Sequence, residues 1–554
     1  MPFPALPTAP YIHPMQAFAT LLERLVLTPA RNAKLALIVD YLRHTTDPER
    51  GYALACITGD LSIPSVKPAM IREMTAARVD PVLLALSYDY VGDLAETVSL
   101  IWPARPGANR EPELPEVVET LNEASRIEGP RRVESWLDAM SSTGRWALLK
   151  LVTGGLRVGV SARLARQAAA DFGKVDVAEI EEIWHGLTPP YESLFAWLEG
   201  KAPKPVSAAL APFRPVMLAH PLLSKSERSD PDALDPEAVT PHQYAAEWKW
   251  DGVRVQLVSE GGVRRLYTRN GDDISKAFPD LLEHADFNAA LDGELLIRSP
   301  DGGVASFNEL QQRLNRKTVS PKQMADRPAF LRAYDLLVEN GEDIRPAPFA
   351  DRRKRLERFV VSLHDARIDL SPMIRFETAA QLEDLRRNPP TPEIEGLMLK
   401  RWTAPYVAGR PAGLWHKWKR DPHLIDAVLM YAQRGHGKRS SYYSDFTFGV
   451  WRKTEEGAEL APVGKAYFGF TDEELMQLDK YVRDHTYERF GPVRSVVASK
   501  SEGLVLEVAF EGIQRSPRHK SGVAMRFPRI HRIRWDKPAA EADTMATLEA
   551  MLEP

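Results

Sequence analysis

The residues best suited to chemistry lie in the stretch EWKWDGVR at positions 247–254. If this stretch is a β-strand, Glu247, Lys249 and Asp251 project from one face and the two tryptophans from the other. A lysine between large aromatic rings and carboxylates is partly desolvated and has proton acceptors nearby, so its amine could lose a proton and attack. The pattern predicts covalent catalysis by Lys249. On its own, the tetrapeptide KWDG favours a simpler interpretation, an exposed strand that ends at a glycine turn.

Two glutamates and two lysines farther along could bind a metal ion and a phosphate. Glu294 and Glu395 carry the hard oxygen ligands that magnesium prefers. Lys417 and Lys419 are two residues apart, so on a strand they share one face and could contact one phosphate together. In isolation, Glu294 could equally be a turn carboxylate and the lysine pair a solvated basic strand.

Further short motifs follow residues 247–254 in a fixed order. They are YTRNG at 267–271, LDGEL at 291–295, RAYDLL at 332–337, EGLMLK at 395–400, WHKWKR at 415–420, RFPRI at 526–530 and RWDK at 534–537. In this order they resemble the nucleotidyltransferase motifs of the ATP-dependent DNA ligases. The stretch KLVTGGLRVG at 150–159 is similar to the glycine-rich signature in the helical DNA-binding domain of archaeal and eukaryotic replicative ligases. The resemblance therefore covers nearly the whole chain.

The resemblance implies a reaction and a role for each motif. Lys249 would attack the α-phosphorus of ATP, release pyrophosphate and become lysyl-AMP. AMP would then pass to the 5′-phosphate of a nick in duplex DNA, where attack by the 3′-hydroxyl forms the phosphodiester. The implied ATP-binding residues are Glu247, Arg254, Arg269, Glu294, Tyr334, Lys400, Lys417, Lys419, Arg534, Asp536 and Lys537. Glu294 and Glu395 would hold Mg²⁺, or Mn²⁺ in its place.

Three of these assignments depend on the resemblance more than on spacing. Glu247 would accept a hydrogen bond from the adenine amino group, although an ion pair with Lys249 is the simpler interpretation. Tyr334 would offer its ring to adenine where the family usually has phenylalanine, although a core tyrosine is the alternative. Lys400 lies five residues after Glu395, so strand alternation alone does not direct both side chains into one pocket.

Residues outside the central motifs would contact DNA and pyrophosphate. The implied DNA-binding residues are Lys150, Gly154, Gly155, Arg157 and Gly159. Glycines remove side chains where a backbone must approach a phosphate, although small residues at a helix packing junction explain this stretch almost as well. In the last motif, the resemblance implies that Arg534, Asp536 and Lys537 orient pyrophosphate.

The pattern of hydrophobic residues predicts a multidomain α+β protein. Residues 16–198 have helical spacing, residues 200–221 contain five prolines, and short alternating strands begin after residue 244. We expect an all-α DNA-binding domain at 15–205 and a mixed α/β nucleotidyltransferase domain at 206–420. A β-domain follows at 421–540, which the resemblance implies is an OB-fold barrel, and then an acidic tail at 541–554. A short terminal helix and a frayed tail both remain open.

Composition narrows the class of protein. The 554 residues carry a formal charge of −4 and include one cysteine, so an internal disulfide is excluded. Three segments are strongly basic nonetheless, at 141–174, 397–439 and 514–537, which suggests a surface for an extended polyanion. No P-loop, zinc motif, export signal or membrane span is found in the sequence. We expect a cytoplasmic monomer, nucleoid-associated if prokaryotic, whose partner is nicked DNA.

Two other functions remain open at this point. An RNA ligase or an mRNA-capping guanylyltransferase shares the lysine motif, but the helical domain and its signature at 150–159 argue against it. A catalytically inactive nucleic-acid clamp would have lost the lysine or a carboxylate, and Lys249, Glu294 and Glu395 are all present. The sequence leaves open whether the pathway is replication, repair or recombination, and which proteins bind the chain.

Overall fold

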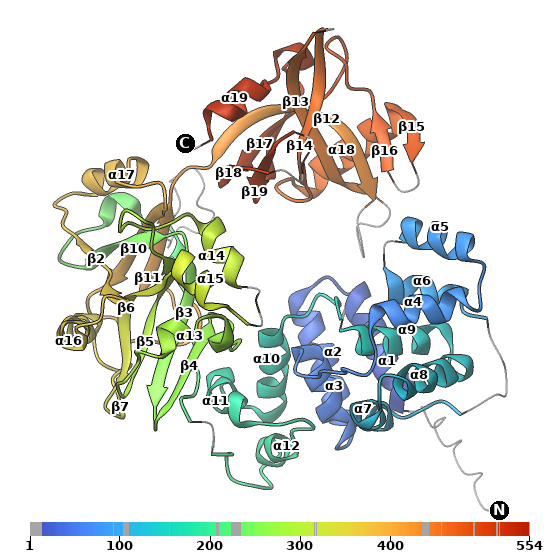
Figure 1. Cartoon of the computed structure of the whole chain (residues 1–554), viewed down its shortest axis with the longest axis horizontal. Coiled ribbons are helices and arrows are strands. Elements are labelled where there is room, and N and C mark those ends of the chain that lie inside the picture. The colour runs from blue at the N-terminus through green and yellow to red at the C-terminus, as the bar shows by residue number, and fades with distance from the viewer. Residues whose placement is uncertain are drawn as a thin grey trace, which may run out of the picture. The chain divides into compact units, whose positions relative to one another are not determined.

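Helices make up the first part of the chain in the computed structural model (Figure 1). The structure describes residues 14–552 except 92, 104–109, 155, 207–209, 223–233, 315, 317, 435–441, 456, 491–492, 517–518 and 520. The helices are α1 (Pro14–Leu27), α2 (Arg31–His44), α3 (Glu49–Thr58), α4 (Pro68–Ala76), α5 (Pro81–Val91), α6 (Leu94–Ile101), α7 (Leu114–Glu123), α8 (Glu128–Ala139), α9 (Ser142–Thr153), α10 (Ala162–Gly173), α11 (Val177–Ile183) and α12 (Glu192–Leu198), with a 3₁₀ turn at Trp184–Gly186.

Apolar stripes and side-chain caps explain these helices. In α1, Leu21, Leu22 and Leu25 recur at helical spacing and are buried. Asp93 and Ser141 accept hydrogen bonds from backbone amides in the first turns of α6 and α9, which satisfies donors that the helix itself leaves unpaired. Cys56 of α3 is buried, and burial raises the pKa of its thiol to about 12. Among the described helices, none is long and apolar enough to cross a membrane.

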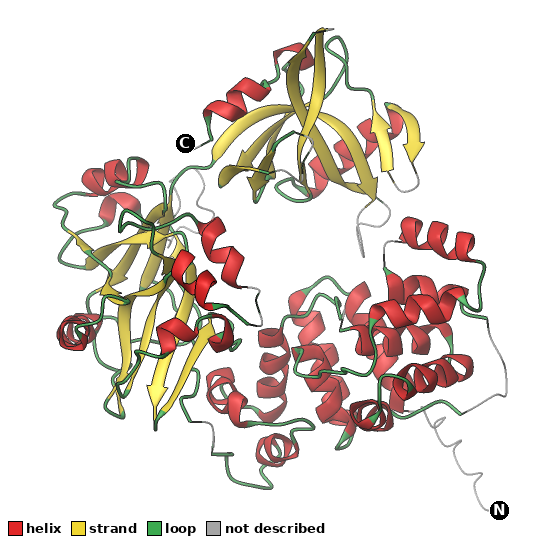
Figure 2. Cartoon of the chain, viewed as in Figure 1, coloured by secondary structure: helices red, strands yellow, loops and turns green. Residues whose placement is uncertain are grey.

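Two sheets form the middle part of the chain, with helices on their outer faces (Figure 2). The five-stranded sheet has the order β1-β11-β10-β2-β9 and the six-stranded sheet has the order β4-β3-β5-β6-β7, with β8 beside β6. Their strands are β1 (His220–Pro221), β2 (Tyr244–Trp250), β3 (Val253–Glu260), β4 (Val263–Thr268), β5 (Ala289–Ile297), β6 (Ala329–Glu339), β7 (Glu342–Asp343), β8 (Ile368–Leu370), β9 (Met373–Ile374), β10 (Ile394–Arg401) and β11 (Trp415–Lys419). The helices are α13 (Pro279–Leu282), α14 (Phe307–Leu314), α15 (Pro321–Asp326), α16 (Phe349–Leu363) and α17 (Ala379–Arg387).

Alternation along the strands divides the apolar residues among three cores. Val258 of β3 and Trp415 of β11 belong to one cluster, which joins the two sheets. Leu397 of β10 packs with Leu382 of α17 on the outer side of the five-stranded sheet. Leu356 of α16 belongs to the core on the outer side of the six-stranded sheet. Side chains that point inward from both sheets therefore line the space between them.

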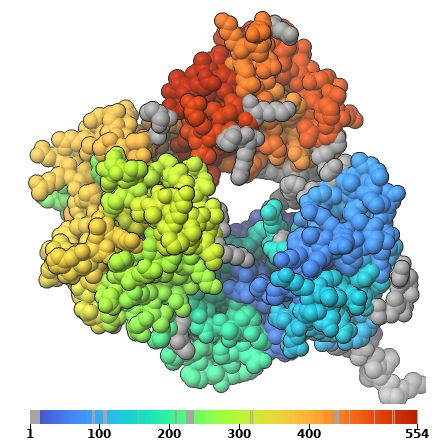
Figure 3. Space-filling model, viewed as in Figure 1, coloured from blue at the N-terminus to red at the C-terminus, as the bar shows by residue number. Residues whose placement is uncertain are grey.

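A β-rich part ends the chain, drawn in orange and red in the space-filling view (Figure 3). Its elements are β12 (His423–Arg434), β13 (Tyr443–Thr454), β14 (Gly457–Ala466), α18 (Asp472–Asp484), β15 (Thr486–Phe490), β16 (Val493–Val496), β17 (Val505–Phe510), β18 (Gly512–Arg515), β19 (Val523–Arg526), β20 (Arg529–Arg534) and α19 (Met545–Ala550). The first half of β12 pairs with β17 and the second half with β16, so this long strand joins both sides of one curved sheet. The expected succession of a helical, a mixed and a β-rich part is confirmed.

The end of the chain is a packed helix as far as Ala550, and not a frayed tail. Met545 and Leu548 of α19 are buried in the core of the β-rich part, and Thr544 caps the helix. Met545 and Leu548 are three residues apart, so they lie on one face of α19. This apolar face explains why the helix packs on the core although the segment is acidic overall.

The described chain divides into two units, Ala169–Asp421 and the remainder. Helices α11 and α12 belong to the first of these units. Arg345 Nη2 lies 3.0 Å from Glu182 Oε1, and the rings of His185 and Tyr267 are 5.0 Å apart. Helical spacing predicts that these helices form, but it does not indicate what they pack against.

The packing of α19 can be tested by replacing Leu548, whose side chain is fully buried. Leu548→Ala should lower the free energy of unfolding by about 2–5 kcal/mol, because it leaves a cavity in the core. Differential scanning calorimetry measures the change. The exposed neighbour Glu549 gives the control, and equal small effects of Leu548→Ala and Glu549→Ala would show that α19 does not stabilise the core.

Candidate active site

A cavity of about 500 Å³ lies between the two sheets of the middle part. Its walls include the predicted residues Glu247, Lys249, Arg254, Arg269, Glu294, Tyr334, Glu395, Lys400, Lys417 and Lys419. Seven basic and three acidic side chains line the cavity. The fold thus brings every site residue predicted within the middle part into one place.

The register of the five-stranded sheet explains how the lysines meet. Lys249 of β2 pairs with Gly396 of β10, and Gly396 pairs with Lys419 of β11. Directly paired residues point to the same side of a sheet, so both lysines face the cavity. A Cβ at Gly396 would collide with the backbone oxygen of Trp418, so the close approach of β10 to β11 requires glycine there.

A β-bulge places Glu395 beside Lys249. On β10 the register shifts between Ile394 and Gly396, and this shift leaves Glu395 as the extra residue. A bulge redirects the side chain of its extra residue relative to the alternation of the strand. Glu395 and Lys400 therefore both line the cavity, although five residues separate them. Sequence spacing could not show this.

The six-stranded sheet supplies the opposite wall in the same way. Glu294 of β5 pairs directly with Arg254 of β3. Between β5 and β6 the register also shifts, from Asp292 with Asp335 to Gly293 with Ala333, so that Tyr334 is an extra residue too. Its ring lies beneath two cations, 5.8 Å from the Arg254 guanidinium and 4.4 Å from the Lys400 ammonium.

Lys249 is held as an ammonium ion in this cavity, whereas its sequence neighbours alone indicate an amine that could lose its proton. Its Nζ donates a hydrogen bond to Glu395 Oε2 over 2.6 Å. Burial lowers the pKa of Lys249, but the charges of Glu395 and Glu294 outweigh burial and raise this pKa above its ordinary value. The flanking tryptophans indicate only desolvation of Lys249. The charge of Glu395 could not be anticipated, because this residue lies on β10, far away in the sequence.

Glu294 and Glu395, two of the three acidic side chains of the cavity, differ in protonation. Burial raises the pKa of Glu294 to about 8, and the negative charge of Glu395 adds to this effect. Burial would also raise the pKa of Glu395, yet the nearby charges of Lys249 and Lys419 lower it to about 2. The described residues contain no cluster of three or more histidine, cysteine or acidic side chains that could hold a metal ion by itself.

The basic side chains of the cavity repel one another, which favours the binding of anions between them. Burial lowers the pKa of Lys417, and the charges of Lys249 and Lys419 lower it further. Burial likewise lowers the pKa of Arg269, with Arg254 and Arg410 contributing. Clustered cations in a cavity bind phosphate groups strongly, because the anion relieves their repulsion. Arg410 lines the cavity too and was not predicted, although it lies within the basic segment 397–439.

Glu247 and Arg254 have partners that the sequence did not indicate. Glu247 is 1% exposed and forms an ion pair of 2.5 Å with Lys400, not with Lys249. Arg254 donates two hydrogen bonds to the carboxylate of Asp292, over 3.0 and 2.6 Å. The Asp292 contact fixes Arg254 at the cavity wall.

The predicted DNA-binding residues are not alike in the structure. Lys150 is 6% exposed and its Nζ lies 2.5 Å from Asp93 Oδ2, which suits a packing role better than phosphate contact. At Gly159, a Cβ would meet Nζ of Lys34, a residue that also donates to the Gly159 carbonyl oxygen. Gly154 ends α9 with φ +67° and faces open space, and Arg157 is exposed. Gly155 lies outside the described residues.

The predicted residues of the last motif form an ion cluster in the β-rich part. Arg534 Nε donates to Asp536 Oδ1 over 2.9 Å, and its Nη1 lies 3.3 Å from Asp426 Oδ2. Lys537 Nζ donates to the same Asp426 oxygen over 2.8 Å. Asp426 of β12 was not predicted, because only the pairing of distant strands brings it beside this motif.

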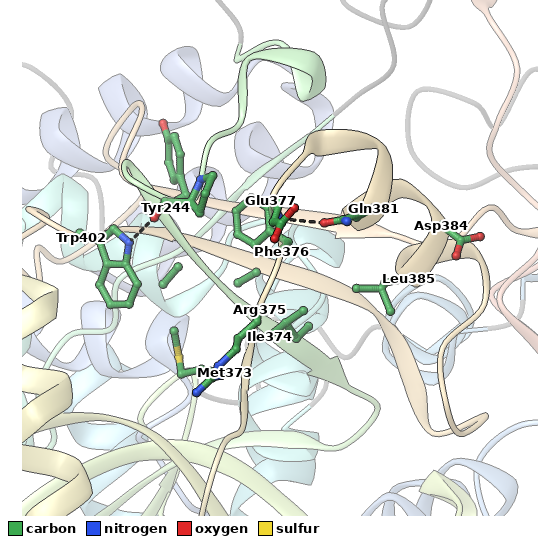
Figure 4. A pocket seen from close by; sticks show the side chains of 13 residues that line it. Tyr244, Met373, Ile374, Arg375, Phe376, Glu377, Gln381, Asp384, Leu385 and Trp402 are labelled. Atoms are coloured by element: carbon green, nitrogen blue, oxygen red, sulfur yellow. Dashed lines mark hydrogen bonds between the residues drawn. The ribbon is translucent and has the colours of Figure 1, made fainter.

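A second cavity, of about 770 Å³, lies at the β9 edge of the five-stranded sheet (Figure 4). Ile374, Phe376 and Leu385 give it an apolar wall, and Arg375 and Glu377 lie at its side. None of the predicted site residues lines this larger cavity. The reactive groups are therefore concentrated in the smaller one.

Models of two protein families match the chain. The family described as ATP dependent DNA ligase domain matches residues 221–419, which contain the cavity between the sheets. The family described as ATP dependent DNA ligase C terminal region matches residues 439–537.

Curated relatives extend the similarity to the helical part. A DNA ligase 1 of Korarchaeum cryptofilum (strain OPF8) is 30% identical over 563 residues, which cover 97% of this chain and 98% of that protein. A probable DNA ligase of Koribacter versatilis (strain Ellin345) is 29% identical, with 97% and 96% covered. Among solved structures, one named "Pmar-Lig_PreS3" has a TM-score of 0.57 at 15% identity and covers 93% of this chain and 99% of that one. This last likeness shows a shared fold.

The state of Lys249 can be tested without any ligand. Glu395→Gln removes the nearest negative charge, so the pKa of Lys249 should fall and its free amine should become more abundant at pH 8. Acetylation of Lys249 by acetic anhydride should then be roughly tenfold faster for each pKa unit lost. Mass spectrometry measures the label. Glu393→Gln, a change of the same kind two residues earlier, is the control, and an unchanged rate in Glu395→Gln would contradict the assignment.

Proposed function

Because the chain belongs to the ATP-dependent DNA ligase family, we propose that it seals nicks in duplex DNA through a lysyl-AMP intermediate. The observation that carries the proposal is the convergence of every predicted residue of the middle part on one cavity rich in basic groups. An RNA ligase or a capping enzyme would share the lysine. The similarity to DNA ligases over 97% of the chain, helical part included, favours DNA.

In the first step, Lys249 Nζ attacks the α-phosphorus of ATP. The phosphorus–nitrogen bond forms, the bond to pyrophosphate breaks, and the ammonium must lose its proton beforehand because only the free amine has a lone pair. Lys417, Lys419 and Arg269 are suited to hold the phosphates in line. Tyr334 offers its ring to adenine, and Glu247 is placed to accept from the adenine amino group.

Glu294 and Glu395 fit a Mg²⁺ ion, or Mn²⁺ in its place. Both are hard oxygen donors, and a cation between them would favour the charged form of Glu294, whose pKa burial raises to about 8. Two carboxylates suffice for Mg²⁺ when phosphate oxygens and water complete the coordination. The ion would neutralise charge on the transferring phosphate and draw negative charge away from Lys249.

The other parts of the chain would bind DNA and assist the first step. We assign residues 15–205 to a DNA-binding domain in which Arg157 and the backbone around Gly154 and Gly159 contact phosphates, while Lys150 supports the fold. Residues 421–540 would form an OB-fold whose Arg534 and Lys537, held by Asp426 and Asp536, meet the pyrophosphate. A monomer acting in the cytoplasm accords with this division of tasks.

The central prediction concerns the covalent intermediate. Lys249→Ala should abolish transfer of label from α-³²P-ATP to the protein, because it removes the amine that we assign as the nucleophile. A denaturing gel measures the labelled protein. Lys276, which is exposed on another segment, provides the matched control, and Lys276→Ala should label normally. Persistent labelling of Lys249→Ala would rule out the assignment.

A second prediction separates phosphate contact from packing in the helical part. Arg157→Glu should weaken binding to a nicked duplex roughly tenfold and make it less dependent on salt, because a phosphate contact is lost. Fluorescence anisotropy across a KCl series measures both. Lys150→Ala should instead lower thermal stability, since it breaks the ion pair between the buried Lys150 ammonium and the half-buried Asp93 carboxylate. If Lys150→Ala changed the salt dependence of DNA binding and Arg157→Glu did not, Lys150 would be the phosphate contact and Arg157 would not.

A further inference from the structure

Arg353 of α16 lies directly behind Glu247. It is 4% exposed and does not line the cavity. Its Nη1 donates a hydrogen bond to Glu247 Oε1 over 3.0 Å. One oxygen of the Glu247 carboxylate is therefore held from the side away from the cavity.

The Arg353 guanidinium is itself fixed in orientation. Its Nε donates to Glu357 Oε1 over 2.8 Å, one turn later on α16. Its Nη2 donates to the backbone oxygen of Ser371 over 2.8 Å, just before β9. A planar guanidinium with three such bonds has little freedom to rotate, so it can impose its orientation on a partner.

Lys400 holds the other oxygen of Glu247. Its Nζ lies 2.5 Å from Oε2 and donates to the backbone oxygen of Tyr334 over 3.2 Å. Three rings surround the same ammonium, those of Tyr334, Phe349 and Trp415, at 4.4, 4.9 and 4.7 Å. Apart from Lys400, no described residue donates a hydrogen bond to Oε2. This oxygen keeps the capacity to accept from a ligand.

We propose that Arg353 is a positioning residue that turns the Glu247 carboxylate toward the exocyclic amino group of the nucleobase and so makes the site select 6-amino over 6-oxo purine nucleotides. The inference rests on the proposed function, because it requires that the cavity bind ATP. A carboxylate only accepts hydrogen bonds, so it attracts the amino group of adenine and repels the oxygen that hypoxanthine carries there. Loss of a required donor partner in a buried site can cost several powers of ten in specificity.

The test compares ATP with ITP as donors for labelling of Lys249. For Arg353→Lys and Arg353→Ala we expect kcat/KM with ATP to fall about 10- to 100-fold, chiefly through KM, and the ATP-to-ITP preference to fall at least tenfold. Lysine keeps the charge but cannot reproduce the three bonds. In a Glu247→Ala background the same changes should leave the preference unaltered, because Arg353 then has no carboxylate to orient.

Arg355 gives the matched control on the same helix. It is ion-paired with Glu339 and Glu342 and does not line the cavity, so Arg355→Lys should keep the wild-type preference. If Arg353→Lys folds normally and lowers labelling by ATP and ITP equally, Arg353 only supports the fold and the inference is wrong. If the unmodified protein forms no adenylate with ATP, the proposed function itself fails, whatever the variants do.

Discussion

Two β-bulges determine which side chains can meet in the cavity. One makes Glu395 the extra residue of β10, and the other makes Tyr334 the extra residue of β6. Each side chain would follow the ordinary alternation of its strand if the register were regular. The first bulge is supported by Gly396, whose lack of a side chain allows β10 to approach the backbone of β11. The positions of the Glu395 carboxylate and of the Tyr334 ring both depend on these irregularities.

Electrostatics in the cavity keep the Lys249 side chain protonated. Lys249 is stabilised as an ammonium by Glu395 and Glu294, so it cannot attack in this state. The remaining basic groups repel one another and gain from an anion. Under the proposed function, a triphosphate with its cation would offset both sets of charges, because it would bring negative charge to the lysines and positive charge to the carboxylates. Binding of the substrate would then lower the pKa of Lys249 and so favour the loss of its proton.

Helix α16 contacts both sheets that line the cavity, through two neighbouring arginines. Arg352 and Asp335 form a fully buried ion pair of 2.8 Å that holds α16 against β6 beside Tyr334. The next residue, Arg353, reaches Glu247 on the other sheet. Neighbouring arginines on one helix thus contact both sheets, and the separation of the sheets and the orientation of Glu247 are set together. Replacing such a buried pair by apolar residues often changes stability little, whereas removing one partner is strongly destabilising.

The sequence by itself determined the order of helical, mixed and β-rich parts and the set of motif residues that line the cavity. Alternation and helical spacing are local properties, so they could be recognised along the chain. Only the tertiary structure decided that Glu395 and Lys400 share a pocket, that Lys249 is charged, and that Lys150 is buried against Asp93. Each of these depends on a bulge or on a partner far away in the chain. Local spacing carries no information about either, because the partner that sets a charge or covers a side chain is chosen only when distant strands and helices pack.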